Sequence, residues 1–250
     1  VFVADVNSVK VELSQEFNDK LNKLSDLSLR NSYSTHITPA SRGTIVYTDQ
    51  LLHPNRSFIF LKANLEISGN YTVPGLFIPL VNGLTNAPRE VGGLKTIARI
   101  PYAEYIKPDF DASYHQVLNP HNMLVYRIAM GYGIEGPNSS SLPFEKSFFG
   151  GGANSLRAWQ ARTLGPGSYK NEINIEQSGD MKFESNIELR SSIFKILEGA
   201  AFVDAGNIWT HHTDNARPGS QFNAKNFFDE MAIGAGLGLR FNFSFFILRL

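Results

Sequence analysis

The stretch at residues 148–169, FFGGGANSLRAWQARTLGPGSY, decides how the rest of the sequence is interpreted. Three consecutive glycines and a Gly-Pro-Gly exit at 165–167 exclude a regular helix or strand, because glycine loses the most entropy on ordering and adopts backbone angles that other residues avoid. We therefore predict a shaped loop that carries Arg157 between Leu156 and Trp159. In an arbitrary protein such a loop is most often an ordinary surface loop with an incidental arginine. The segments on either side favour a more specific interpretation.

Those flanking segments alternate between apolar and polar residues. The clearest example is 55–70, where one set of alternate positions is apolar and the other is polar, which is typical of a strand with one oily and one wet face. The same pattern predicts about eight strands in all, at 35–49, 55–70, 105–115, 123–133, 181–193, 200–209, 233–243 and 245–250.

The predicted strands have two further properties that concern the architecture. Their polar faces carry several charges each, more than the inside of a soluble sandwich accepts without pairing. Their connections alternate between short ones, at 51–54, 118–121 and 195–197, and long ones, at 71–97, 134–179 and 210–227. Both properties are typical of a bacterial outer-membrane barrel. The alternative at this point is a soluble up-and-down barrel or sandwich.

Composition excludes several other classes. The net charge is +0 and the pI is about 7.2, so the basic surface of a nucleic-acid-binding protein is absent. There is no cysteine, which excludes disulfides and thiol catalysis. No apolar run is long enough for a membrane-spanning helix, whereas membrane strands alternate and carry weak hydropathy. The first residues lack the pattern of a signal peptide, so we expect the chain to be an internal piece of a longer protein.

Three motifs in order resemble one family. The sequence GGGANSLRAW resembles the sixth extracellular loop of the BamA/TamA superfamily of outer-membrane assembly factors, and the continuation RTLGPGSY is closer to its TamA-like branch. The segments NIELR at 186–190 and FVDAGNIW at 202–209 resemble the strands that follow this loop in the family. The resemblance covers about 35–250. One departure is Ala158, where the family usually has glycine.

The resemblance implies a fold and a set of site residues. The fold is an all-β, transmembrane antiparallel β-barrel, with about eight of sixteen strands present. Residues 1–31 form a loop and short helix region, with the helix at 16–27, and 32–250 form the partial barrel, with 134–180 as the long loop that folds inward. The loop latch comprises Gly151, Gly152, Leu156, Arg157 and Trp159, and the expected partners in the lumen are Glu188 and Asp204. Independently of the family, the alternation places both carboxylates on the polar face of neighbouring strands.

The resemblance also implies a function. It indicates a non-enzymatic factor of the bacterial outer membrane that assembles, inserts or translocates proteins, with clients entering at a lateral strand seam. The implied partners are outer-membrane lipid and lipopolysaccharide, unfolded β-barrel clients and an inner-membrane or periplasmic partner reached through upstream domains, with no nucleic acid. A passive channel or a two-partner-type secretion pore is the alternative, and a barrel-bound hydrolase is a third hypothesis.

A search for catalytic and ligand motifs supports the non-enzymatic hypothesis. There is no nucleophile elbow and no Walker loop. The spacing of Gly234, Gly236 and Gly238 predicts a face made small where the wall is crowded. The pair His211-His212 is more often solvated than metal-bound, and for Asp109 and Asp111 a charge network in the lumen is favoured over an acid/base pair. We therefore expect no catalytic residue, cofactor or metal.

Overall fold

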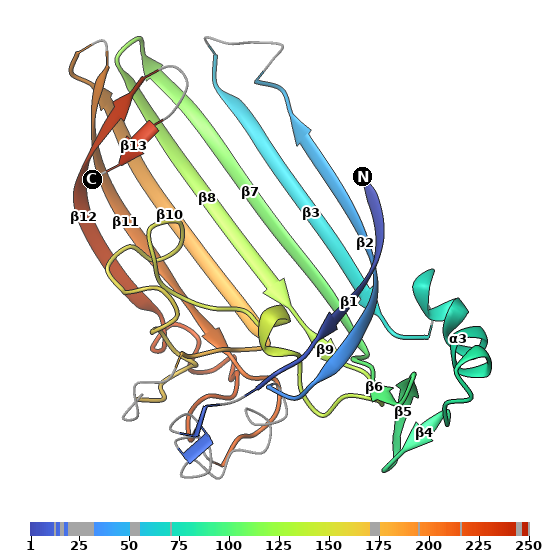
Figure 1. Cartoon of the computed structure of the whole chain (residues 1–250). Coiled ribbons are helices and arrows are strands. Elements are labelled where there is room, and N and C mark those ends of the chain that lie inside the picture. Colours follow the sequence, from blue (N-terminus) through green and yellow to red (C-terminus); the bar gives the residue numbers. More distant parts are fainter. Residues whose placement is uncertain are drawn as a thin grey trace.

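The structure is a computed structural model that describes residues 1–12, 14–15, 18–19, 33–50, 56–70, 72–170, 176–194, 196–215, 217–243 and 247–249 (Figure 1). Its main sheet has ten strands, and nine of them lie in the order β1-β2-β3-β7-β8-β10-β11-β12-β13, with the short β9 beside β7. The strands are β1 Phe2–Val9, β2 His36–Thr48, β3 Phe58–Ser68, β7 Tyr105–Asn119, β8 Asn122–Tyr132, β9 Ile134–Glu135, β10 Met181–Ser192, β11 Leu197–Trp209, β12 Ala232–Asn242 and β13 Ile247–Arg249. Every neighbouring pair is antiparallel, and the eight predicted strands are confirmed.

The two faces of the sheet differ in chemistry because side chains alternate along each strand. One face exposes large apolar side chains, among them Ile45, Leu65, Phe110, Ile128 and Ile187. The opposite face carries the charged residues of the same strands, such as Arg42 paired with Glu66 and Arg127 paired with Asp111. This is the apolar-out, polar-in arrangement of a membrane barrel wall.

The long connections lie together at one end of the strands (Figure 1). The first, between β3 and β7, contains η1 Pro74–Phe77, α3 Ile78–Leu84, β4 Glu90–Val91, β5 Leu94–Ile97 and β6 Ile100–Pro101. The second, between β8 and β10, contains β9 and η2 Phe144–Lys146, and the third joins β11 to β12. The described short connections, at 120–121 and at 193–194 with 196, lie at the other end, whereas the predicted turn at 51–54 lies outside the described residues. Among the described residues, no helix is both long and apolar enough to cross a membrane.

The N-terminal region differs from its prediction. Residues 2–9 were expected to belong to a loop and short helix region, but they form β1, which pairs with β2 from Phe2↔Gly43 to Val9↔His36. Val3 and Val9 interrupt the alternation of β1, so its pattern is weak, and the strand depends on β2 for its backbone hydrogen bonds. Most of the predicted helix at 16–27 lies outside the described residues.

Candidate functional site: a loop held against the polar wall

The tip of the loop at 148–169 is a tight turn that requires glycine. Gly151 and Gly152 have φ values of +90° and +101°, a backbone region that side-chain-bearing residues rarely adopt. A Cβ on Gly151 would lie 2.2 Å from the carbonyl oxygen of Gln160. The amide of Gly152 donates to the carbonyl of Trp159 at 2.9 Å, which closes the turn. The two glycines therefore bring the two arms of the loop close together, and the residues from 153 to 158 form its tip.

Arg157 lies at this tip and contacts both predicted carboxylates. Its Nε and Nη2 donate to the two oxygens of Asp204 at 2.8 and 2.6 Å, and its backbone amide donates to Asp204 Oδ2 at 3.0 Å. Its Nη1 donates to Glu188 Oε2, and its guanidinium stacks over the ring of Phe202 at 3.4 Å. A planar guanidinium can make such a bidentate contact and stack at the same time, which the ammonium of lysine cannot.

Burial and charge act in opposite directions on Arg157. Burial disfavours the charged form, but the hydrogen bonds and charges of Asp204 and Glu188 outweigh it and raise the pKa of Arg157 above its ordinary value. Glu188 also accepts from Arg190 Nε at 2.6 Å and lies 3.4 Å from Arg240 Nη1. The loop is thus joined to a charge network that extends over β10, β11 and β12.

A second attachment of the loop was not predicted. Ser155 donates to Glu184, whose other oxygen accepts from Arg127 at 3.3 Å. Arg127 also holds Asp111 at 2.7 Å, and Asn186 accepts from Arg127 at 3.0 Å while donating to Asp204 at 2.9 Å. Asn186 therefore connects the two attachments. The sequence signal was available, since these side chains lie on the charged face of predicted strands, but the pattern does not say which charges meet.

A third attachment lies at the other side of the loop. Lys146 of η2 contacts Glu66 Oε1 at 2.6 Å, and Glu66 also accepts from Arg42 Nε at 2.7 Å and from the hydroxyl of Tyr105 at 2.5 Å. Next to Lys146, Oε1 of Glu145 forms a hydrogen bond with His36 Nε2 at 2.8 Å. The connection is thus fixed on β2 and β3 as well as on β10 and β11.

Small residues make room for the rest of the latch. A Cβ on Gly234 would lie 2.5 Å from Cβ of Ala158 and 3.1 Å from the ring of Trp159, and one on Gly236 would lie 2.6 Å from Phe202. Leu156 is fully buried, and a Cβ on Gly206 would lie 3.3 Å from it. The prediction of a glycine face at a crowded part of the wall is confirmed for Gly234 and Gly236.

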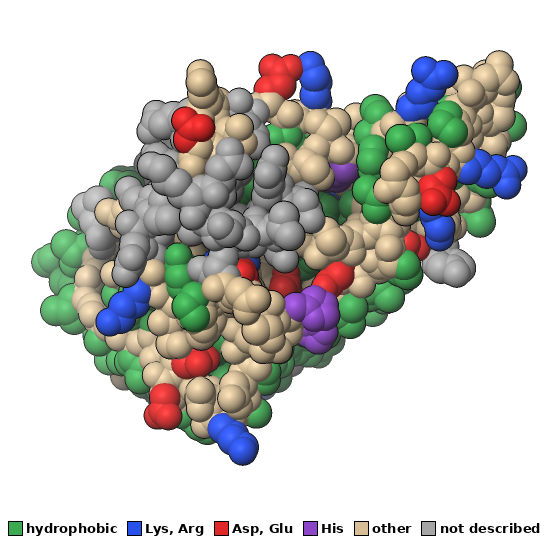
Figure 2. All heavy atoms as spheres, turned by 90° about the horizontal axis from the view of Figure 1, so that it is seen from below, with side chains coloured by type: hydrophobic (Ala, Val, Ile, Leu, Met, Phe, Trp, Pro, Cys, Tyr) green, Lys and Arg blue, Asp and Glu red, His purple; other side chains and the backbone are tan. Residues whose placement is uncertain are grey.

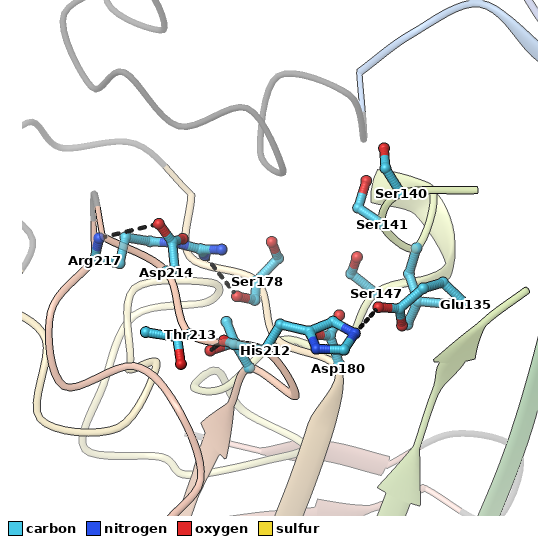
Figure 3. Close-up of a pocket in the computed structure, with 12 residues that line it drawn as sticks. Glu135, Ser140, Ser141, Ser147, Ser178, Asp180, His212, Thr213, Asp214 and Arg217 are labelled. Atoms are coloured by element: carbon cyan, nitrogen blue, oxygen red, sulfur yellow. Dashed lines mark hydrogen bonds and ion pairs between the residues drawn. The ribbon is translucent and has the colours of Figure 1, made fainter. Parts of the chain in front are cut away.

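A small polar cavity lies at the rim, where the long connections meet (Figure 3). Its volume is about 40 Å³, and its lining includes Glu135, Asp180 and His212. His212 Nε2 contacts Glu135 at 2.5 Å. Arg217 donates one hydrogen bond to Asp214 at 2.6 Å and another to the carbonyl of Ser178 at 3.1 Å. These contacts tie the 133–180 connection to the β11–β12 connection.

The remaining candidate residues have separate partners. Asp109 accepts from Asn64 at 2.6 Å, whereas Asp111 pairs with Arg127. The hydroxyl of Tyr132 lies 2.7 Å from His211 Nδ1. Within the part of the chain that the structure describes, no group of three or more His, Cys, Asp and Glu side chains could hold a metal ion. The arrangement can hold a loop in place.

Comparisons with known proteins found similarities in sequence and in structure. The chain is similar to the outer membrane protein assembly factor BamA of Neisseria meningitidis serogroup B (strain ATCC BAA-335 / MC58), with 29% identity over 109 residues that cover 40% of the chain. The chain spans 13% of that relative's length. It is also similar to the crystal structure of BamA from Haemophilus ducreyi lacking POTRA domains 1-3, with 16% identity, a TM-score of 0.42, and coverage of 87% of this chain and 51% of that one.

The family follows from a match that covers more than half of the chain. The Omp85 superfamily domain matches residues 99–250, a range that contains the latch loop, both carboxylates and the glycine face. The finer assignment to a TamA-like branch stays a prediction. The chain belongs to the Omp85 superfamily, and its sheet is part of a β-barrel of the bacterial outer membrane.

Proposed function

We propose that the chain is the barrel part of a non-enzymatic factor that assembles or translocates proteins at the outer membrane. Family membership and the similar assembly factor from Neisseria meningitidis support this proposal. Because the chain spans a small part of that relative, the activity is inferred from the site and the family together.

The observation that carries the proposal is the contact of Arg157 with Asp204 and Glu188. It places a partly buried cation between carboxylates of β10 and β11, with the loop tip packed on β12. Such a contact is costly to break, because a single missing partner leaves an uncompensated charge. The loop therefore connects three neighbouring strands through one set of contacts.

The finer part of the proposal concerns where clients enter. We infer that they are inserted at a lateral seam, where an exposed strand edge pairs with an incoming β-strand. Neighbouring strands from β1 to β13 are all hydrogen-bonded, so the seam would lie outside these described pairs. Unfolded β-barrel proteins would be the clients, with outer-membrane lipid and lipopolysaccharide around the wall and further partners reached through other domains.

The test uses full-length protein in cells depleted of the wild-type copy. Arg157→Ala and Arg157→Lys should both lower the assembly of a resident β-barrel client, measured by its heat-modifiability and its resistance to external protease. The matched control is Arg162→Ala in the same loop, because Arg162 forms an exposed ion pair with Glu176 at 2.9 Å. Normal client assembly with Arg157→Ala would contradict the proposal.

A second measurement separates assembly from passive conduction. Purified full-length protein in planar bilayers should show low steady conductance, because the loop is fixed inside the wall. A large, steady conductance together with unaffected client assembly in the depleted cells would instead favour the pore hypothesis.

A further inference from the structure

The connection between β3 and β7 contains an apolar helical segment that the proposed function does not use. Residues 67–88 include no charged side chain. Within this stretch, η1 and α3 expose Leu76, Leu80 and Leu84 at 71%, 58% and 77%, and Phe77 is exposed as well. Their spacing places these side chains along one side of a continuous helical stretch.

The opposite side of this segment is fixed to the protein, so the exposed stripe has a defined orientation. Ile78 is buried in a cluster with Ile37, Ile97 and Tyr102. The amide of Asn82 donates to the carbonyl of Thr96 at 2.7 Å, and its oxygen accepts from the backbone amide of Ala98 at 2.9 Å. Turning the stripe inward would break these buried contacts.

The start of the segment lies on the outer face of the wall. The backbone amide of Val73 donates to Ser41 Oγ at 3.2 Å. Ser41 alternates with Arg42, whose side chain faces the polar side with Glu66, and therefore shares the apolar face with Ile45. Figure 1 shows α3 beside the sheet and away from the latch loop, and Figure 2 shows hydrophobic side chains next to charged ones on the lobe that projects at this side.

We propose that η1 and α3 form an interfacial anchor that inserts Leu76, Phe77, Leu80 and Leu84 into the outer leaflet of the membrane. The occupant of this apolar stripe is lipid, because the stripe continues the lipid-facing wall at Ser41 and Ile45 and no charge interrupts it. Apolar side chains of an interfacial helix bury at the boundary between headgroups and acyl chains. The inference rests on the outer-membrane location of the family and not on the assembly activity.

Site-directed spin labels test the anchor. Leu80→Cys and Leu84→Cys would be labelled in an otherwise cysteine-free full-length protein, reconstituted in phosphatidylcholine and phosphatidylglycerol vesicles. Ile45→Cys is the lipid reference, and Lys225→Cys, on an exposed residue of the β11–β12 connection, is the water reference. Heat-modifiability would verify that each variant is folded.

We expect the labels at 80 and 84 to collide with lipid-soluble oxygen several-fold more often, relative to a water-soluble nickel chelate, than the label at 225 does. The ratio of oxygen collisions to nickel-chelate collisions at 80 and 84 should approach the ratio at 45. A ratio equal to that at 225 would show a stripe exposed to water, and shielding from both reagents would show a stripe covered by protein. Either result would overturn the anchor.

Discussion

Asp204 illustrates how the latch works at the scale of single residues. Its side chain is 0% exposed, and its oxygens accept hydrogen bonds from Arg157 and Asn186. A buried carboxylate is tolerated only when its charge is paired and its hydrogen bonds are satisfied. Arg157 therefore supplies what Asp204 cannot obtain from water.

Replacing Arg157 with alanine should lower the free energy of unfolding by about 3–5 kcal/mol, because Asp204 would remain buried without its cation. Arg157→Lys should recover only part of the loss, since a point charge cannot span both carboxylates. Chemical unfolding of the reconstituted protein would measure the change. Arg162→Ala serves as the control, with a smaller loss expected, because Arg162 forms an exposed ion pair with Glu176 and a contact over the ring of Phe149 at 4.5 Å. Equal losses in Arg157→Ala and Arg162→Ala would refute a special role for Arg157.

Glu145 predicts a response to acid. Burial raises the pKa of Glu145, but its hydrogen bond with His36 and the neighbouring charges outweigh this and leave the pKa below its ordinary value of 4.5. The ionised form therefore stabilises the loop above that ordinary value, and the contribution disappears as the pH falls through the lowered pKa. The protection of the backbone amides at 143–148 against hydrogen exchange, corrected for the intrinsic rate at each pH, should fall over this range.

Glu145→Gln should remove this acid-induced loss of protection at 143–148. Glu176→Gln is the control, because Glu176 lies in the exposed pair with Arg162 and its loss should leave the response at 143–148 intact. The explanation would fail if Glu145→Gln kept the full wild-type response to acid.

At the scale of elements, β12 is shaped by the loop that packs on it. Gly234 and Gly236 leave space for Ala158, Trp159 and Phe202, so the strand gives up side-chain packing to admit the latch. A strand glycine often marks such a close approach.

Gly234→Ala should therefore destabilise the protein by about 1–3 kcal/mol, the usual cost of overpacking. Adding Ala158→Gly should restore much of the loss, because it removes the atom nearest to the new methyl group, 2.5 Å away. Gly43→Ala in β2 is a matched control, since a Cβ there meets nothing within 4 Å. Chemical unfolding of the wild type, of Gly234→Ala, of Ala158→Gly and of the double variant gives a double-mutant cycle. Absence of rescue would mean that Ala158 is not the obstacle.

At the scale of the whole molecule, neighbouring residues of one strand face different solvents. Ile45 is 74% exposed on the apolar face and Val46 is 54% exposed on the polar face. A barrel in a bilayer places the first in lipid and the second in the lumen.

Ile45→Lys should cost up to about 2–4 kcal/mol in a bilayer, depending on its depth. Val46→Lys should cost less, because its charge faces the lumen, where repulsion from Lys62 on the neighbouring strand is its main penalty. Because the two positions are adjacent, depth and strand context are matched. Unfolding titrations in vesicles would measure both. Similar costs at the two positions would contradict the assigned orientation of the wall.

The sequence by itself determined most of the wall, and the reason is local. Side-chain alternation is a property of each strand, so eight strands, the alternating lengths of their connections and the shared face of Glu188 and Asp204 could all be predicted. The main sheet has two exceptions. The alternation of β1 is interrupted and its hydrogen bonds come from β2, and β9 has only two residues, too few to show alternation.

Only the tertiary structure decided which charges meet. Glu184 contacts Ser155, which is 29 residues away in the sequence, and Arg127, which is 57 residues away. Nothing in the alternation selects one lumenal partner over another. The alternation also does not pair Lys146 with Glu66. Nor does it predict the hydrogen bond from Val73 to Ser41, which places η1 and α3 outside the wall. Alternation specifies a face, whereas the loop path and the curvature of the sheet specify which residues on that face come within bonding distance.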